Sequence, residues 1–394
     1  MKKTLRWGIA MAALVAGACL AGMPAMAEDC IVKIGNAGPM TGGGSSWGLA
    51  MKAGVDFEAA VTNAAGGLQM GDKKCKVVVI AVDSMSTAAG AAAAANYLAS
   101  QGVHATNGPV VGPESTGFKP VGKRNKIVSF TPTFAADAIG PDFPHAFHEV
   151  QGPPIWGTAA IKAVRERFKI NSAVIIAPND QGGTDTVDAL TKLYEAAGVK
   201  TGGEYYQRGT TNFSPLAIRI MGMNVDAVDF TSLPPGEAAI LAKQLREAGY
   251  EGAFGRLGAG GDVIIANTGG PTAQKSFYWF DHIPTEDPAA IKMKEDFERV
   301  MKQPMPDNLL VYNAMITSEI LLKAIQKAGT DQDGDKIADA LRSTTPESRY
   351  FGAHGWRGKA QFGVNQEFSF PVGVHFIRNG KSEPGVKIEI PAES

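Results

Sequence analysis

Residues 31–48 read IVKIGNAGPMTGGGSSWG, and this stretch decides the fold class. The apolar start, residues 31–39, predicts a buried strand, and the glycine-rich part, residues 40–48, predicts a loop. Residues 49–63 then keep small and apolar side chains at helical spacing, which predicts a helix. A strand, a polar loop and a helix in this order form the first unit of an open α/β sheet, which binds ligands beyond the carboxyl ends of its strands.

Ser45, Ser46 and Trp47 lie in this loop and are therefore candidate ligand contacts. The alternative is a plain turn with an exposed tryptophan. A nucleotide-binding loop is excluded, because the stretch contains neither the Gly-Lys-Ser/Thr of a phosphate-binding loop nor the G-x-G-x-x-G of a dinucleotide turn.

Residues 1–27 have the pattern of a secretory signal peptide: basic residues at the start, an apolar run over residues 9–21, and Ala-Met-Ala at residues 25–27 as a cleavage site. Cys19 raises the alternative of a lipid anchor, but the residues before it lack the large aliphatic side chain that such a site usually has. No later stretch approaches about 18 uninterrupted apolar residues. We therefore expect an exported protein that does not span the membrane.

The charge of the chain argues against nucleic acid as a partner. The formal net charge is −1, and loss of the three basic residues of the signal segment changes it to −4. A weakly acidic chain without a basic stripe lacks the electrostatic footprint that phosphate backbones require.

Cys30 and Cys75 remain after cleavage, and each directly precedes a predicted strand. If these strands are neighbours, as in the doubly wound order 2-1-3, the cysteines can approach the roughly 5.5 Å Cα separation that a disulfide prefers. An exported location permits the bond, and it would stabilise the fold by about 3 to 4 kcal/mol. A metal or redox pair would need C-x-x-C or a nearby histidine cluster, and neither occurs.

Two domains are expected, because roughly 365 mature residues exceed what one hydrophobic core usually organises. Strand and helix patterns alternate along the chain, which predicts an α/β fold with parallel sheets. The predicted strands are residues 31–36, 77–82, 105–107, 127–130, 172–177, 227–231, 277–280 and 372–378, and the predicted helices include residues 88–101, 155–168, 184–198, 215–223, 235–249, 288–301 and 308–329.

The sequence offers little support for catalysis. A secreted hydrolase would need an activated nucleophile, yet no G-x-S-x-G elbow occurs, and the six histidines show no H-E-x-x-H or other metal-ligand spacing. We expect a protein that is not an enzyme, with no catalytic residues, no cofactor and no metal site.

Several short motifs, taken in their order and spacing, resemble the type I periplasmic solute-binding proteins of the branched-chain amino acid (Leu/Ile/Val-binding) ABC transporter family. The resemblance covers essentially the whole mature chain. The motifs are residues 35–42 (GNAGPMTG), 47–48 (WG), 64–68 (AAGGL), 83–84 (DS), 107–109 (NGP), 211–216 (TNFSPL), 351–356 (FGAHGW) and 360–362 (AQF).

This resemblance implies two Rossmann-like lobes with parallel sheets, joined by three hinge crossings, so that each lobe is built from discontinuous segments. Ligand would lie in the cleft between the lobes, which close about the hinge. His148 is the one histidine that a crossing would bring near the cleft, and the others are interpreted as surface or turn residues. The expected first lobe is residues 28–148 and 281–352, and the expected second lobe is residues 149–280 and 353–394, with the last crossing near residues 351–356.

The family places ligand contacts on three loops of the first lobe. Trp47 fits the position where the family covers its ligand with an aromatic ring. A second loop usually holds the ligand carboxylate with a serine and backbone amides. This chain has Val-Val-Gly-Pro at residues 110–113, so backbone N–H groups or Ser115 would serve. The candidate contacts of this lobe are Ser45, Ser46, Trp47, Val111, Gly112, Thr131, Thr133 and Phe134.

The second lobe departs from the family pattern. The family tends to have a Tyr before Gly where this chain has Asn-Asp-Gln-Gly-Gly at residues 179–183, and a carboxylate for the ligand ammonium near residues 258–261, where this chain has none until Asp262. A buried ammonium without a charged partner is costly, which disfavours an aliphatic L-amino acid unless Asp180 substitutes. The candidate contacts here are Asp180, Gln181, Leu233 and Gly260.

The function implied by the resemblance is that of a periplasmic substrate-binding subunit of an ABC importer, working as a monomer. It would trap a small organic solute, such as an amino acid or an aromatic or other organic acid, and deliver it to an inner-membrane permease and its ATPase. The alternatives are a periplasmic sensor that presents its solute to a receptor, and a secreted hydrolase.

Overall fold

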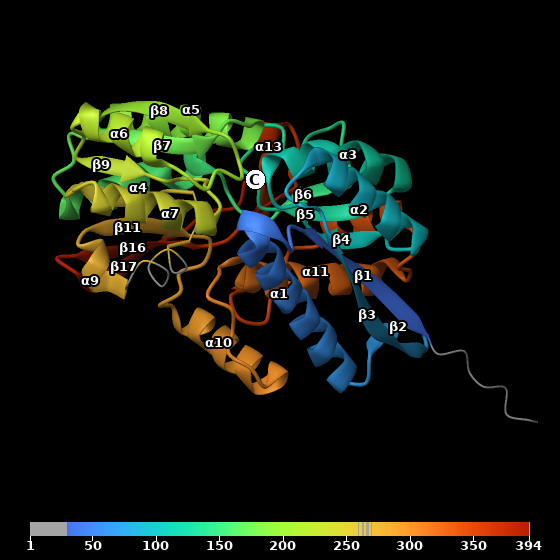
Figure 1. The fold of residues 1–394 in the computed structure, drawn as a ribbon. Helices are drawn as coiled ribbons and strands as arrows, with labels where there is room; N and C mark the ends of the chain where they lie inside the picture. Colours follow the sequence, from blue (N-terminus) through green and yellow to red (C-terminus); the bar gives the residue numbers. More distant parts are fainter. Residues whose placement is uncertain (1–29, 259, 262–263, 265–267, 269, 394) are drawn as a thin grey trace, which may run out of the picture.

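Two α/β lobes form the protein in the computed structural model, which describes residues 30–258, 260–261, 264, 268 and 270–393 (Figure 1). The expected signal peptide, residues 1–27, lies outside the described residues. Strands and helices alternate along the chain, and each lobe has one sheet in which parallel neighbours dominate. The predicted α/β class is therefore confirmed.

The sheet of the first lobe has the order β14-β15-β6-β5-β4-β1-β3-β2. Its strand β1 pairs in parallel with both β3 and β4, so this strand lies inside the sheet and is buried along most of its length. The strands are β1 (Ile31–Gly38), β2 (Leu68–Met70), β3 (Lys73–Asp83), β4 (Ala105–Asn107), β5 (Val128–Thr131), β6 (Ala146–His148), β14 (Gly355–Arg357) and β15 (Glu367–Ser369).

Helices cover both faces of this sheet. One face packs on a core shared with α1, α10, α11 and α12, and the other on a smaller core shared with α2 and α3. Gly54 of α1 permits the close approach of α11, because a Cβ there would lie 2.4 Å from the Val311 carbonyl oxygen. The elements are η1 (Gly42–Gly44), α1 (Ser45–Ala64), α2 (Ala88–Ser100), α3 (Gly112–Asn125), α10 (Pro288–Met301), α11 (Leu310–Ala328), α12 (Gly334–Arg342) and α13 (Lys359–Phe362), with the small hairpin β12 (Glu347–Ser348) and β13 (Gly352–Ala353).

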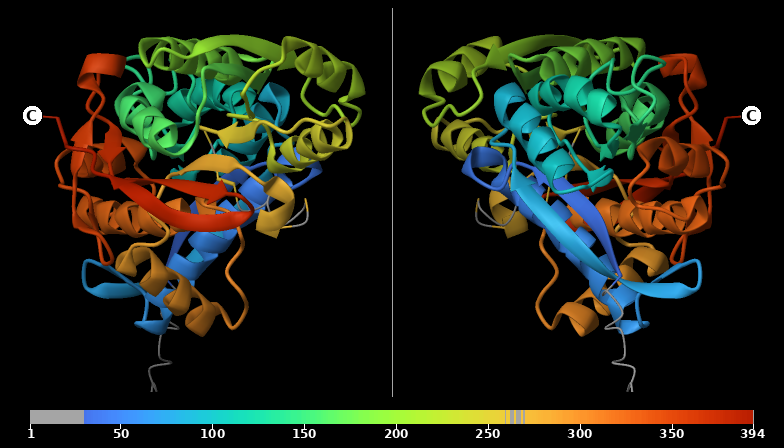
Figure 2. Two further views of the ribbon diagram at one scale, coloured as in Figure 1. Left: turned by 90° about the vertical axis from the view of Figure 1, so that its left-hand side faces the viewer. Right: turned by 90° about the vertical axis from the view of Figure 1, so that its right-hand side faces the viewer.

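The sheet of the second lobe has the order β17-β16-β11-β10-β9-β7-β8, and its edge hairpin of β16 and β17 is seen in red in the left view of Figure 2. Its strands are β7 (Ser172–Pro178), β8 (Lys200–Tyr206), β9 (Ala227–Asp229), β10 (Ala253–Arg256), β11 (Phe277–Asp281), β16 (Val372–Arg378) and β17 (Lys381–Ile388).

Strand β7 shows how this sheet is covered on both sides. Val174 and Ile176 belong to one core, which includes α6 and α7, while Ala173 and Ile175 belong to the other, which includes α4 and α5. This alternation follows from the two-residue period of a strand. The helices are α4 (Pro153–Arg167), α5 (Gln181–Ala196), α6 (Ser214–Met223), α7 (Pro235–Glu247) and α9 (Gly270–Gln274).

The chain passes between the sheets three times: after His148, after Asp281 and at residues 370–371. The third passage lies later than the boundary expected at residues 352 and 353. Strands β14 and β15 pair with each other and then with β6, so they extend the first sheet. Both strands are only three residues long and follow sequence that contains glycine. The alternation typical of a strand is therefore not visible in the sequence there.

None of the helices in the described part of the chain is both long and apolar enough to cross a membrane.

The sequence did not predict some of the elements that the structure contains. The exposed strand β8 contains two glycines, and α3 contains Pro120, so both lack the usual apolar periodicity.

The predicted disulfide between Cys30 and Cys75 is confirmed. Strands β1 and β3 are parallel neighbours, with Ile31 opposite Lys76, so the residues that precede them meet at a Cα separation of 4.5 Å. The bond ties the residue before β1 to β3 across a sequence separation of 45 residues.

Replacement of both cysteines (Cys30→Ser with Cys75→Ser) should lower the free energy of unfolding by about 3 to 4 kcal/mol, because the unfolded chain regains the freedom of an open loop. Urea denaturation of the mature protein measures this difference. Reductant should destabilise the native protein and leave the double variant unchanged. An identical denaturation midpoint for the two proteins under oxidising conditions would show that the bond contributes nothing.

Candidate ligand-binding cleft

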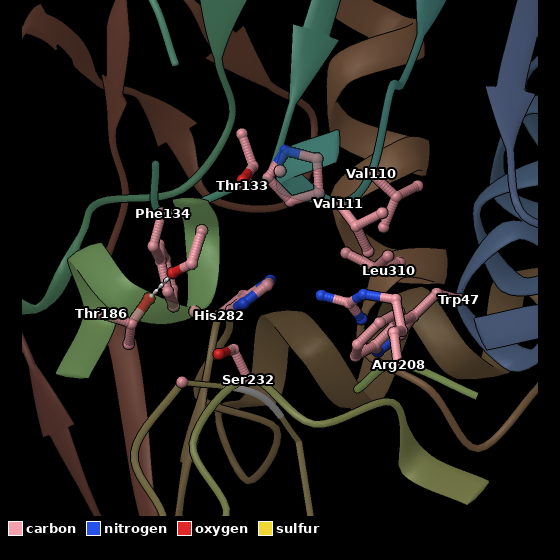
Figure 3. A pocket seen from close by; sticks show the side chains of 15 residues that line it. Trp47, Val110, Val111, Thr133, Phe134, Thr186, Arg208, Ser232, His282 and Leu310 are labelled. Atoms are coloured by element: carbon pink, nitrogen blue, oxygen red, sulfur yellow. Dashed lines mark hydrogen bonds between the residues drawn. The ribbon is translucent and has the colours of Figure 1, made fainter. Parts of the chain in front are cut away.

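A pocket of about 510 Å³ of empty space lies between the lobes, with its walls supplied by both (Figure 3). The carboxyl ends of parallel strands face the same edge of each sheet, which is why loops from both lobes converge here. The first lobe contributes Trp47, Val110, Val111, Gly112, Pro132, Thr133, Phe134 and Leu310; the second contributes Gly182, Gly183, Thr186, Arg208, Ser232 and Gly258; His282 comes from the second crossing.

The lobes touch each other beside the pocket, where the N-termini of α3 and α5 meet at Gly112 and Gly182. A Cβ at Gly112 would lie 2.8 Å from the Gly182 nitrogen and 3.1 Å from its Cα. Two hydrogen bonds also cross the cleft: the Ala136 N–H donates to Asp185 Oδ2 at 2.8 Å, and Gln181 Nε2 donates to Asp137 Oδ1 at 2.9 Å. The two lobes are therefore in direct contact across the cleft.

Apolar side chains and rings form much of the first-lobe wall. Trp47 and Leu310 belong to the core of the first lobe, where α1 and α11 pack together. Phe134 lies 6.2 Å from the ring of His282 and 6.3 Å from that of Trp156, measured between ring centroids. This wall can contact an apolar or aromatic ligand body.

His282 is buried and lines the pocket, so its interpretation as a surface or turn residue is wrong. Its Nδ1 lies 3.3 Å from Asn313 Oδ1, while its Nε2 has no hydrogen-bond partner among the described residues. Burial lowers the pKa of His282 to about 4, so the ring is neutral near pH 7. His148 instead lies under the site, where its ring bonds Glu367 Oε1 and the Thr133 carbonyl, each at 2.7 Å.

Arg208 is the one cationic side chain among the described residues that line the pocket. Its Nε and Nη2 donate to Asp180 Oδ2 at 2.9 and 2.6 Å, and Asp180 Oδ1 accepts the Gly183 N–H at the start of α5. Glu237 Oε1 fixes the same loop by accepting the Gly209 N–H at 2.9 Å. No sequence signal revealed Arg208, because its partner lies 28 residues away and only the fold brings them together.

Glu114 occupies the backbone amides at the start of α3. Its Oε2 accepts the N–H groups of Val110 and Val111 at 2.9 and 3.2 Å, and its Oε1 bonds the Ser84 hydroxyl and the Ser86 N–H. Burial raises the pKa of the Glu114 carboxyl above its usual value. These amides, which the family resemblance assigned to a ligand carboxylate, therefore already have an acceptor from the protein.

The expected contacts divide into two groups. Five of them, Trp47, Val111, Gly112, Thr133 and Phe134, line the pocket. The others lie outside its lining for identifiable reasons. Ser45 and Ser46 form the first turn of α1, and Thr131 is buried. Asp180 caps α5 and pairs with Arg208, while Gln181 bridges the lobes at the surface. The carbonyls of Leu233 and Gly260 accept hydrogen bonds from buried Arg256.

The contact of Gly112 with Gly182 predicts that Gly112→Ala hinders closure. The added methyl group meets backbone of the opposite lobe, so ligand binding should weaken by about 1–3 kcal/mol, as for overpacked interiors. Calorimetry would measure the affinity, and solution scattering the ligand-induced compaction. Gly202→Ala is the matched control, because a Cβ there meets nothing within 4 Å. Equal affinity and equal compaction for Gly112→Ala and the native protein would contradict the closed contact.

Comparison with known proteins agrees with this geometry. The periplasmic binding protein family model matches residues 31–370. The chain is 26% identical to the leucine-, isoleucine-, valine-, threonine- and alanine-binding protein of Pseudomonas aeruginosa, over 82% of this chain and 85% of that protein. The leucine-binding protein LivK of Thermotoga maritima has the same fold, with a TM-score of 0.76, 22% identity, and coverage of 91% and 99%. So does an R. palustris solute-binding protein solved with benzoate, with a TM-score of 0.74, 18% identity, and coverage of 92% and 98%. The chain belongs to the periplasmic binding protein family.

Proposed function

We propose that this protein is the periplasmic binding subunit of an ABC importer, which captures a small organic solute in the cleft and delivers it to an inner-membrane permease and its ATPase. One observation carries the proposal: a pocket whose walls come from both lobes, at a place where the lobes make direct contact. A ligand in such a pocket stabilises the closed arrangement over an open one, because it contacts both walls only when they meet.

The rest of the chain supports this role. The pattern of residues 1–27 is that of an exported protein. One chain supplies both walls of the pocket, so a monomer suffices for binding. The relatives in the comparison are solute-binding proteins, and the P. aeruginosa relative is named for amino acids.

A solute that binds the cleft should raise the melting temperature, with about 2.7 kcal/mol of added stability at a hundredfold excess over the dissociation constant. A thermal-shift screen of amino acids, organic acids and amides measures this effect. Deletion of the permease genes should then abolish cellular uptake of the solute that binds. Turnover of a chromogenic ester or amide, with no solute changing the melting temperature, would refute the transport role.

A ligand found in this screen allows the contribution of Trp47 to binding to be tested. Trp47→Ala should weaken binding by about 1.5–3 kcal/mol, the value of burying a large apolar side chain. Tyr97→Ala is the control, because Tyr97 is an exposed aromatic residue of the same lobe. Because Trp47 also packs in the core, Trp47→Phe keeps the fold while removing part of the contact. Unchanged affinity in both Trp47 variants would remove this residue from the site.

A further inference from the structure

The polar groups of the pocket are few, and most are already engaged by the protein. Thr186 Oγ1 donates to the Gly182 carbonyl at 2.6 Å. Three buried side-chain groups of the lining have no hydrogen-bond partner among the described residues: Arg208 Nη1, Ser232 Oγ and His282 Nε2. A buried donor or acceptor without a partner carries the cost of its lost hydration, so a ligand that satisfies these groups gains the corresponding affinity.

Arg208 holds the strongest of the three groups. Its pair with Asp180 uses Nε and Nη2, which fixes the plane of the guanidinium and leaves both N–H groups of Nη1 available. The guanidinium extends toward the middle of the pocket, in the direction of His282 (Figure 3). A planar donor group fixed in this way matches a carboxylate.

Among its described lining residues, the first lobe offers that carboxylate only neutral donors, such as the Gly112 N–H and the Thr133 hydroxyl. Glu114 takes the N–H groups of Val110 and Val111, and Pro113 has no N–H to offer. A second carboxylate placed at the same amides would meet the Glu114 side chain. The charged donor among the described lining residues therefore lies on the second lobe, at Arg208.

Among the described residues that line the pocket, none supplies a counter-charge for an ammonium group. None of its described lining residues is Asp or Glu. Asp180, which could have substituted, has one oxygen bonded to Gly183 and the other to Arg208. His282 is neutral, since burial lowers its pKa to about 4. An enclosed ammonium would thus find no charged partner among the described lining residues, and an unpaired buried charge is costly.

We propose that the ligand is a small monocarboxylate without an ammonium group, whose carboxylate binds Nη1 of Arg208 and whose uncharged body lies against Trp47, Phe134 and Leu310. This inference rests on the proposed function, since it names the solute class of the same cleft. Ser232 Oγ and the unengaged Nε2 of His282 remain to bond a hydroxyl or amide of the ligand body.

Matched ligand pairs test the class directly. Calorimetry with 3-phenylpropanoate and L-phenylalanine, and with 4-methylpentanoate and L-leucine, compares acids that differ by the amino group. 3-Phenylpropanamide removes the carboxylate charge. We expect each acid to bind at least about tenfold more tightly than its amino acid, and 3-phenylpropanoate at least about tenfold more tightly than its amide, as for a charge-assisted hydrogen bond.

The outcomes separate this inference from the proposed function. Tighter binding of either L-amino acid, or of a solute without a carboxylate, would overturn the monocarboxylate class and leave the importer role standing. Failure of every compound in a broad solute screen would overturn the importer role together with the inference.

Variants of Arg208 test the anchor. Arg208→Gln should weaken binding of the acid about tenfold or more and leave binding of its amide unchanged. Arg208→Lys keeps the charge and the pairing with Asp180, so its affinity for the acid should lie between those of the native protein and of Arg208→Gln. This variant keeps the test valid if Arg208→Gln does not fold. Arg219→Gln is the control, because Arg219 pairs with Glu204 at the surface of the same lobe. Equal losses for acid and amide, or no loss for the acid, would overturn the role of Arg208.

Discussion

The meeting of two helix N-termini at Gly112 and Gly182 is the constraint on which the cleft depends. Parallel strands direct the N-termini of the following helices to one edge of each sheet, so α3 and α5 face each other across the cleft. With no side chain at either position, backbone meets backbone across the cleft. The pocket beside this contact is then walled by residues of both lobes, and its shape exists only when the lobes are together.

The carboxylates of Glu114 and Asp180 determine which polar groups face the pocket, because each of them binds donor groups of the protein itself. Glu114 accepts the N–H groups of Val110 and Val111 just before α3, and the first-lobe wall consists mainly of rings and apolar side chains. Asp180 caps α5 and holds Arg208, which leaves the second lobe with an oriented guanidinium. The two helix ends are thus equivalent in the fold but different in chemistry, and the difference assigns the anion to one lobe and the apolar body to the other.

Much of the fold could be predicted from the sequence, because buried strands and amphipathic helices leave local periodicity. The Cys30–Cys75 pair followed from strand adjacency together with the pattern of an exported protein, and Trp47 from its place after the first strand. The residues of the site were harder to predict from the sequence than the fold. Arg208, Ser232 and His282 reach the pocket through loops and a crossing that no periodicity marks, and the role of Glu114 depends on distances between turns. The third crossing lies later in the chain than the sequence predicts, because β14 and β15 are too short to show a strand period.

A crystal structure of the protein with its tightest-binding monocarboxylate tests the central claim most directly. We predict closed lobes in contact at Gly112 and Gly182, with a ligand carboxylate oxygen about 2.7–2.9 Å from Arg208 Nη1, the distance of a charge-assisted hydrogen bond. A carboxylate bound to the amides of residues 110–112, with Glu114 displaced and Arg208 turned away from the ligand, would contradict it.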